Sequence, residues 1–76
     1  MSIEDQIQEL EKQVSKLEES NVQLEMFLQE EEESLYRESI VENEELIWRK
    51  TEKIASLKLL LEKNEAIPAG LGPLDD

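Results

Sequence analysis

The side chains of this chain that could do chemistry are almost all carboxylates, and they are densest at Glu30–Glu33. Four consecutive carboxylates attract divalent cations weakly, but this block lacks the loop geometry and carbonyl ligands of a calcium site. The 76-residue chain has no His and no Cys, which excludes thiolate chemistry, disulfides and the usual zinc sites. It also has no Gly-rich phosphate loop. We therefore expect no enzyme activity, no metal site and no cofactor.

The formal charge of −12 is unevenly spread along the chain. Residues 1–35 hold two basic and eleven acidic residues, whereas residues 36–63 hold six of each. An acidic surface repels phosphates, so direct nucleic-acid binding is disfavoured. No apolar run approaches the roughly 20 residues that span a bilayer, and the start of the chain does not resemble a secretory signal. We expect an intracellular protein, cytoplasmic or nuclear, that does not insert into membranes.

The elements that would position these side chains are two amphipathic helices. Residues 1–67 contain neither Gly nor Pro, and apolar residues recur there with heptad spacing in two stripes of different phase. We predict a coiled-coil region over 1–67, with a helix over 2–29, a break over 30–34 and a helix over 35–66. All four Gly and Pro residues fall in 68–76, for which we predict a disordered tail; a short linear motif is the alternative.

The two stripes are out of phase, so a single regular supercoil cannot run through both. We predict an all-α fold, an antiparallel coiled-coil helical hairpin. The alternative is one long helix that pairs antiparallel with a second copy. Antiparallel pairing lays the acidic first half along the half that carries most of the basic residues, whereas a parallel dimer, a minor alternative, puts like halves together.

Asn21 and Asn43 are polar residues within otherwise largely aliphatic stripes, and antiparallel pairing places them opposite each other. Two facing amides satisfy each other's hydrogen bonds, whereas a one-heptad slip sets each against an aliphatic side chain. We predict that this pair sets the register; the alternative is that the seam opens slightly and Asn21 is hydrated. Lys50, also in the second stripe, is expected to reach toward Glu11 and Glu18.

The second helix also carries apolar residues away from its seam. Leu46 and Leu60 are expected to widen the core face. A separate stripe lies further round the helix and is our predicted partner-binding surface, with Trp48 as its anchor, because Trp is enriched at interface hot spots. The alternative is a broad buried face within a larger bundle. The members of this stripe are Val41, Trp48, Ala55 and Leu59.

These features predict a small acidic protein–protein interaction module, an adaptor or a subunit of a larger complex, whose partner is a protein, expected to be helical. One alternative is an acidic inhibitor or mimic that covers a basic site on its target through Glu30–Glu33 and a row of Glu at one heptad position. Another is a self-assembling structural spacer, which would form homo-oligomers. The Glu row, which could also be only a solvated face, comprises Glu4, Glu11, Glu18, Glu25 and Glu32.

Overall fold

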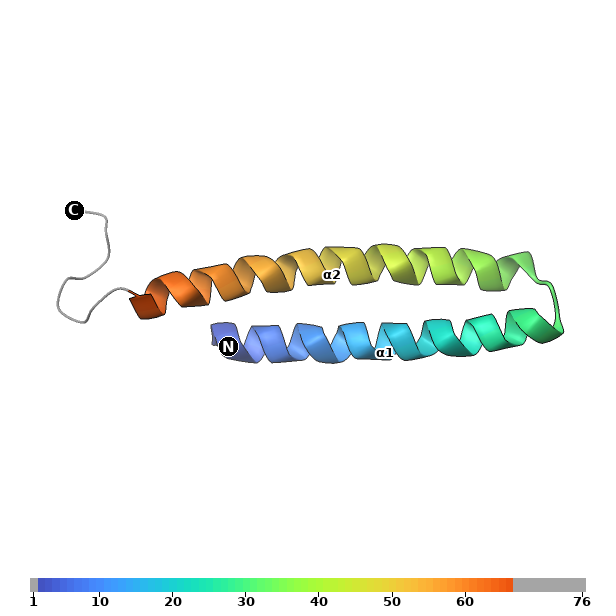
Figure 1. Cartoon of the computed structure of the whole chain (residues 1–76), viewed down its shortest axis with the longest axis horizontal. Coiled ribbons are helices and arrows are strands. Elements are labelled where there is room, and N and C mark those ends of the chain that lie inside the picture. Colours follow the sequence, from blue (N-terminus) through green and yellow to red (C-terminus); the bar gives the residue numbers. More distant parts are fainter. Residues whose placement is uncertain (1, 67–76) are drawn as a thin grey trace.

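The computed structural model describes residues 2–66 and consists of two antiparallel helices joined by a short turn (Figure 1). Helix α1 spans Ile3–Glu30 and helix α2 spans Ser34–Ala66. The predicted all-α helical hairpin is confirmed, and the chain turns back on itself instead of continuing as one long helix. The tail predicted over 68–76 lies outside the described residues.

α1 begins where Ser2 can satisfy its first backbone donors. The Asp5 N–H donates to Ser2 Oγ at 3.0 Å, and the Gln6 N–H donates to the Ser2 carbonyl oxygen at 3.0 Å. Ser2 itself has an extended backbone (φ −73°, ψ 165°). It therefore precedes the helix as its N-cap, which moves the expected start at residue 2 by one residue. The acidic side chains of Glu4 and Asp5 in the first turn stabilise the helix, because they lie near the positive end of its dipole.

The turn occupies residues 31–33, which is shorter than the break predicted over 30–34. Glu30 is still helical, and the Glu31 N–H donates to the Phe27 carbonyl oxygen at 2.9 Å. Glu31 then leaves the helix with an extended backbone (φ −148°, ψ 122°). Any L-residue adopts this conformation, so α1 ends without the glycine that often terminates a helix.

α2 begins at Ser34, after Glu33, whose carbonyl oxygen accepts from the N–H groups of Tyr36 (3.1 Å) and Arg37 (3.4 Å). The Arg37 side chain reaches across the turn and donates to the Glu32 carboxylate. This hydrogen bond lowers the pKa of Glu32 and raises the pKa of Arg37. The contact therefore stabilises the turn while Glu32 is ionised, and it is lost as pH falls through the lowered pKa of Glu32.

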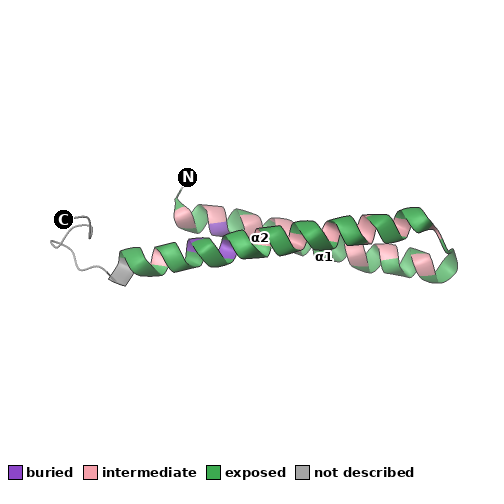
Figure 2. Cartoon of the chain, turned by 90° about the horizontal axis from the view of Figure 1, so that it is seen from above, coloured by how far each residue is buried: buried purple, intermediate pink, exposed green. Residues whose placement is uncertain are grey.

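The interior is a single seam between the two helices. Every position of the two heptad stripes is buried or half-buried. These positions are Ile3, Ile7, Leu10, Val14, Leu17, Asn21, Leu24 and Leu28 of α1, and Tyr36, Ile40, Asn43, Ile47, Lys50, Ile54, Leu57 and Leu61 of α2. Figure 2 shows that the fully buried residues gather at the open end of the hairpin, far from the turn. Ile7, Ile54 and Leu57 are only 7, 9 and 8% exposed, and partly buried side chains surround them. The surrounding side chains are Ile3, Leu10, Val14 and Leu61.

Leu46 and Leu60 do not widen this core, contrary to the sequence-based expectation. Their exposed fractions are 42% and 48%. Two helices can cover only the positions that point directly at each other, and the flanking heptad positions are covered only when a further helix packs beside them. The hairpin therefore leaves these two leucines in solvent.

We predict that Ile54→Ala lowers the free energy of unfolding by about 2–4 kcal/mol, because it removes three carbons from the best-packed part of the seam. Leu59→Ala is the matched control, since Leu59 is 61% exposed and its truncation should change stability by roughly 0.5 kcal/mol or less. Urea unfolding followed by circular dichroism measures both. Equal effects of the two substitutions would contradict this location of the core.

Candidate protein-binding surface

The two seam asparagines meet between the helices. The Asn43 Nδ2 donates to the Asn21 Oδ1 at 2.8 Å, and it also lies 3.5 Å from the Ser20 Oγ. Both amides are half-buried. The hydrogen bond offsets the cost of removing these amides from water. Within the described residues no buried side-chain nitrogen or oxygen lacks a partner.

The sequence predicted that Lys50 reaches toward Glu11 and Glu18, but the structure gives it a different partner. Its Nζ donates instead to the Gln13 Oε1 at 2.8 Å. The reason is geometric, because Lys50 leans to the side of the seam on which Gln13 lies, whereas Glu11 lies on the other side. Glu11 pairs there with Lys58, at 3.4 Å between Oε2 and Nζ.

Contacts across the seam therefore divide the surface of the hairpin into two sides. On the first side lie the Glu11–Lys58 and Glu32–Arg37 ion pairs. We call it the Trp48 face, because Trp48 lies on this side of α2. Its members are Glu4, Glu11, Glu18, Val22 and Glu25 of α1, Glu32 of the turn, and Arg37, Val41, Glu44, Trp48, Thr51, Ala55, Lys58, Leu59 and Glu62 of α2.

On the second side lie the contacts of Gln13 with Lys50, of Ser20 with Asn43, and of Phe27 with Tyr36, whose ring centroids are 5.8 Å apart. We call it the Leu46 face. Its α1 members are Gln6, Glu9, Gln13, Lys16, Ser20, Gln23, Phe27 and Glu30. Its α2 members are Leu35, Ser39, Glu42, Leu46, Arg49, Lys53, Ser56, Leu60 and Lys63.

The predicted partner-binding residues all lie at the surface of α2. Val41, Trp48 and Leu59 are 61, 64 and 61% exposed, and Ala55 is also exposed. Val41, Trp48 and Ala55 repeat every seventh residue, and Leu59 follows Ala55 by one turn, so the four form one continuous stripe.

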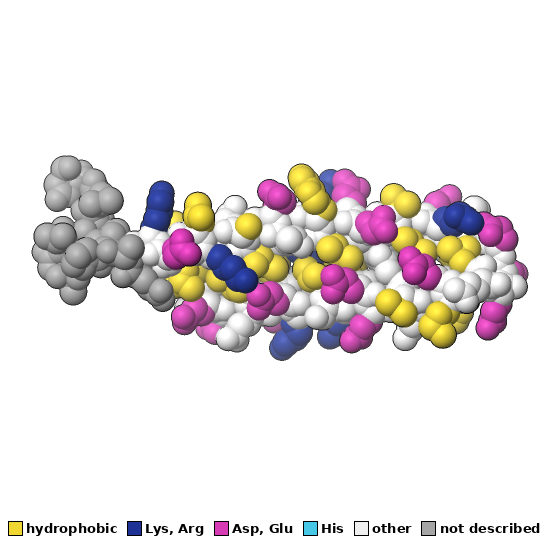
Figure 3. Space-filling model, in the orientation of Figure 1, with side chains coloured by type: hydrophobic (Ala, Val, Ile, Leu, Met, Phe, Trp, Pro, Cys, Tyr) yellow, Lys and Arg dark blue, Asp and Glu magenta, His cyan; other side chains and the backbone are white. Residues whose placement is uncertain are grey.

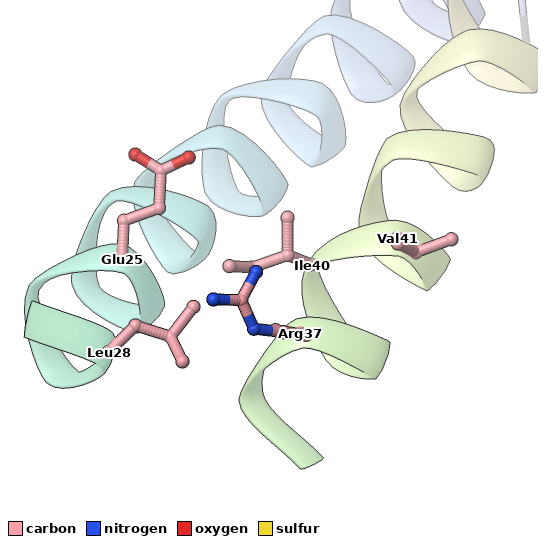
Figure 4. A pocket seen from close by; sticks show the side chains of 5 residues that line it. All are labelled: Glu25, Leu28, Arg37, Ile40 and Val41. Carbon is pink, nitrogen blue, oxygen red and sulfur yellow. The ribbon is translucent and has the colours of Figure 1, made fainter. Parts of the chain in front are cut away.

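A groove opens between the helices beside this stripe (Figure 4). Its volume is about 310 Å³, and it is lined by Glu25 and Leu28 of α1 and by Arg37, Ile40 and Val41 of α2. Figure 4 shows the Arg37 guanidinium directed across the groove toward α1, while Val41 points outward from its rim. The groove is thus apolar at its base, with one carboxylate and one guanidinium at its edge.

Carboxylates surround the stripe. Glu44, Glu45 and Glu52 each lie one helical turn from Trp48, and of these only Glu45 has an ion-pair partner among the described residues, Arg49 at 2.9 Å. The space-filling view shows apolar side chains exposed among acidic ones over both helices (Figure 3). The stripe is therefore an apolar surface within an acidic surround.

The Glu30–Glu33 patch does not form a single cluster of equivalent carboxylates. Glu30 and Glu31 are exposed, whereas the Glu32 charge is matched by Arg37, and Glu33 is half-buried with its carbonyl oxygen accepting the first bonds of α2. Among the residues that the structure describes, no group of three His, Cys, Asp or Glu side chains is arranged to hold a metal ion.

A single-seam helical hairpin with an exposed apolar stripe defines the chain as a small all-α helical module. A family model, the TMA17 helical domain, matches residues 1–65, and the chain belongs to this family. The family is a helical domain of a protein-binding protein of the adaptor type. No curated protein and no solved structure matches the chain significantly. Over the described residues, neither helix is long and apolar enough to cross a membrane.

Sequence reasoning placed the stripe and the Glu row on separate helices and did not recognise that they share one side of the hairpin. It also missed that the opposite side carries Leu46 and Leu60 on a less acidic background. The heptad pattern does contain this information. In an antiparallel pair, the residues that flank the seam on one side occupy equivalent heptad positions in the two helices.

We predict strong coupling between Asn21 and Asn43. Asn21→Leu alone should destabilise the hairpin by about 1–3 kcal/mol, because it leaves the Asn43 amide facing a hydrocarbon. Asn21→Leu combined with Asn43→Leu should recover most of this loss, since two apolar partners replace the amide pair. A double-mutant cycle from urea unfolding measures the coupling. Additive effects of the two single substitutions would show that the amides are independent.

Proposed function

We propose that this chain is an adaptor, or a subunit of a larger complex, that binds a partner protein through the Trp48 face and acts by binding and not by catalysis. The observation that carries the proposal is the 64% exposure of Trp48, between Val41 and Leu59 at 61% each, on a hairpin in which only three of the described residues are buried. Large apolar side chains aligned along one helix are typical of an interaction surface.

The spacing of the stripe favours a helical partner. Val41, Trp48 and Ala55 recur every seven residues, which is the repeat with which one helix contacts another. Apolar anchors at this spacing are typical of surfaces that bind a helix. Trp48 is suited to be the anchor, because burying an indole removes a large apolar area from water. The indole N–H remains able to donate to a partner.

The charges around the stripe favour a basic partner. Glu44 and Glu52 flank Trp48 on α2, and Glu18 and Glu25 of α1 lie on the same face without an ion pair among the described residues. A Lys or Arg side chain over the indole would gain a cation–π interaction and reach these carboxylates. We therefore propose that the partner presents an amphipathic helix with Lys or Arg beside its apolar row.

We predict that a 21-residue amphipathic Leu/Lys helix binds the full chain and that Trp48→Ala weakens this binding at least about tenfold, as expected for a hot-spot tryptophan. Leu60→Ala, on the Leu46 face, is the matched control and should leave the affinity unchanged. Fluorescence anisotropy of the labelled peptide measures the affinity. A blue shift of the emission of Trp48, the only tryptophan of the chain, reports its burial in the wild-type complex.

A Leu/Glu helix of the same length and apolar pattern is the second control and should not bind. Equal affinity of wild-type protein and Trp48→Ala for the Leu/Lys helix would remove Trp48 as the anchor. Binding of the Leu/Glu helix with comparable affinity would contradict the proposed basic partner.

A second candidate function is an acidic mimic that covers a basic site on its target. The observation in its favour is the concentration of charge on the Trp48 face. There, four Glu residues of α1, Glu32 of the turn, and Glu44 and Glu62 of α2 accompany only two basic residues, Arg37 and Lys58. In this case electrostatic attraction, and not burial of Trp48, would supply most of the affinity.

The two candidates differ in their response to salt. For the mimic we predict that raising NaCl from 50 to about 500 mM nearly abolishes binding of the Leu/Lys helix, because exposed charges are screened over a Debye length of about 4–14 Å in this range. Glu18→Gln with Glu25→Gln should then weaken binding more than Trp48→Ala does. For the adaptor the ranking of these variants is reversed, and substantial binding survives at high salt. Isothermal titration calorimetry at the two salt concentrations measures both affinities.

A further inference from the structure

We propose that two copies of this hairpin pair through their Leu46 faces, with α2 against α2 in antiparallel orientation, and so form a four-helix bundle. This surface is distinct from the one that carries the proposed function, and neither proposal rests on the other.

The first argument is apolar exposure. Leu46, Phe27, Leu60 and Leu35 of this face are 42, 49, 48 and 65% exposed. Leu46 also lines a shallow surface hollow together with Glu42, Glu45 and Arg49. Among the residues whose burial the structure describes, the seam alone buries three, so a second layer of apolar contacts would supply the core that a two-helix chain lacks.

The second argument is charge. A chain of net charge −12 repels its own copies, and it can associate with itself only through a surface that escapes this repulsion. The Leu46 face does so, because it holds four basic residues and three acidic ones. The row of α1 that borders the seam here is wholly uncharged. It consists of Gln6, Gln13, Ser20 and Phe27.

The charges of the Leu46 face are also ordered along its length. Lys63, Lys53, Arg49 and Lys16 lie in the half toward the open end of the hairpin, whereas two of the three acids, Glu42 and Glu30, lie toward the turn. An antiparallel two-fold pairing sets the basic half of one copy against the acidic half of the other. Parallel pairing would set basic against basic, so charge selects the antiparallel arrangement.

One register of α2 against α2 pairs leucine with leucine near the ends of the contact and basic with acidic residues inside them. It places Leu60 opposite the partner's Leu35 and Lys53 opposite the partner's Glu42, each pair occurring twice by symmetry. Leu46 then lies opposite the partner's Arg49 near the two-fold axis and packs on the apolar stem of that side chain. A slip of one heptad in one direction sets Lys53 against the partner's Arg49. A slip in the other direction sets Leu46 against the partner's Glu42. Both slips lose the matched pairs, so the sequence specifies this register.

Sedimentation equilibrium of the full chain tests the pairing. We expect a mass twice that of the 8.9 kDa chain at micromolar concentrations. Leu35→Glu with Leu60→Glu should raise the dissociation constant at least about a hundredfold, because it opposes two carboxylates where the register pairs two leucines. Val41→Glu with Leu59→Glu is the matched control. It also replaces two exposed apolar residues by Glu, but outside the Leu46 face, and should leave the dimer intact.

A charge exchange tests the register without altering the apolar contacts. Lys53→Glu should weaken the dimer about tenfold or more, since it opposes two carboxylates twice across the two-fold axis. Adding Glu42→Lys restores opposite charges and should return the dissociation constant to nearly the wild-type value. Circular dichroism of each variant checks that the helices are retained. Failure of the second substitution to rescue the first would overturn the proposed register.

Engineered cysteines distinguish this bundle from a dimer made by exchange of helices, because the chain has no native Cys. Leu35→Cys with Leu60→Cys places thiols at opposite ends of one α2, roughly 37 Å apart at 1.5 Å per residue, so they cannot join within a chain. In the proposed dimer each meets the other residue of the partner, and mild oxidation should yield a covalent dimer. Val41→Cys with Leu59→Cys, off this face, should not.

A wild-type chain that stays monomeric at hundreds of micromolar would overturn the proposal, as would a dimer that dissociates with the Val41 and Leu59 substitutions and not with those at Leu35 and Leu60. Either result leaves the binding of the Leu/Lys helix to the Trp48 face as a separate question. Conversely, if Trp48→Ala abolishes binding of the Leu/Lys helix while the protein keeps the mass of a dimer, the two surfaces act independently.

Discussion

The structure depends on one constraint, which is that two helices in contact bury only one row of side chains from each. A heptad contributes two residues to that row, and the other five remain in reach of solvent. Ile7, Ile54 and Leu57 become buried because aliphatic neighbours surround them on both helices. Leucine, tryptophan and valine at other heptad positions have no such neighbours, so their exposure follows from the number of helices and not from weak packing.

The division of the remaining surface follows from the same geometry. Residues on the two flanks of the seam project to opposite sides, and the sequence treats the two sides differently. One side combines Trp48 with a row of carboxylates, whereas the other combines Leu46 and Leu60 with a near balance of charge. If copies pair through the second side, two Trp48 faces point outward, and a partner with two helices could engage both. Such a bivalent arrangement raises the effective affinity without any new contact.

Much of the fold could be predicted from the sequence, because each heptad stripe identifies one buried row and their phase difference requires an antiparallel arrangement. The opposed positions of Asn21 and Asn43 followed from the same alignment. The direction in which Lys50 leans did not, since a long side chain at the edge of the seam can reach either flank and only the packing around Gln13 decides. The loss of Leu46 and Leu60 from the core also escaped prediction, because their heptad position is buried in bundles and exposed in pairs.

The candidate surface was predicted as a set of residues but not as a surface. Val41, Trp48, Ala55 and Leu59 could be identified from their spacing on one helix, whereas their relation to Glu18 and Glu25 depends on how two helices are oriented about their common axis. Such a relation between helices is visible in a sequence only after the pairing has been assumed. The sequence describes the partner only indirectly, through the charge and shape of the surface that the partner would have to complement.

The concentration of buried residues at the open end has a consequence for the motions of the hairpin. Near the turn, Leu28 and Tyr36 are only half-buried and the asparagine pair replaces an aliphatic contact, so separation of the helices costs least there. Side-chain packing should therefore fluctuate most between the asparagine pair and the turn, where residues 31–33 keep the helix ends joined, and least around Ile7, Ile54 and Leu57.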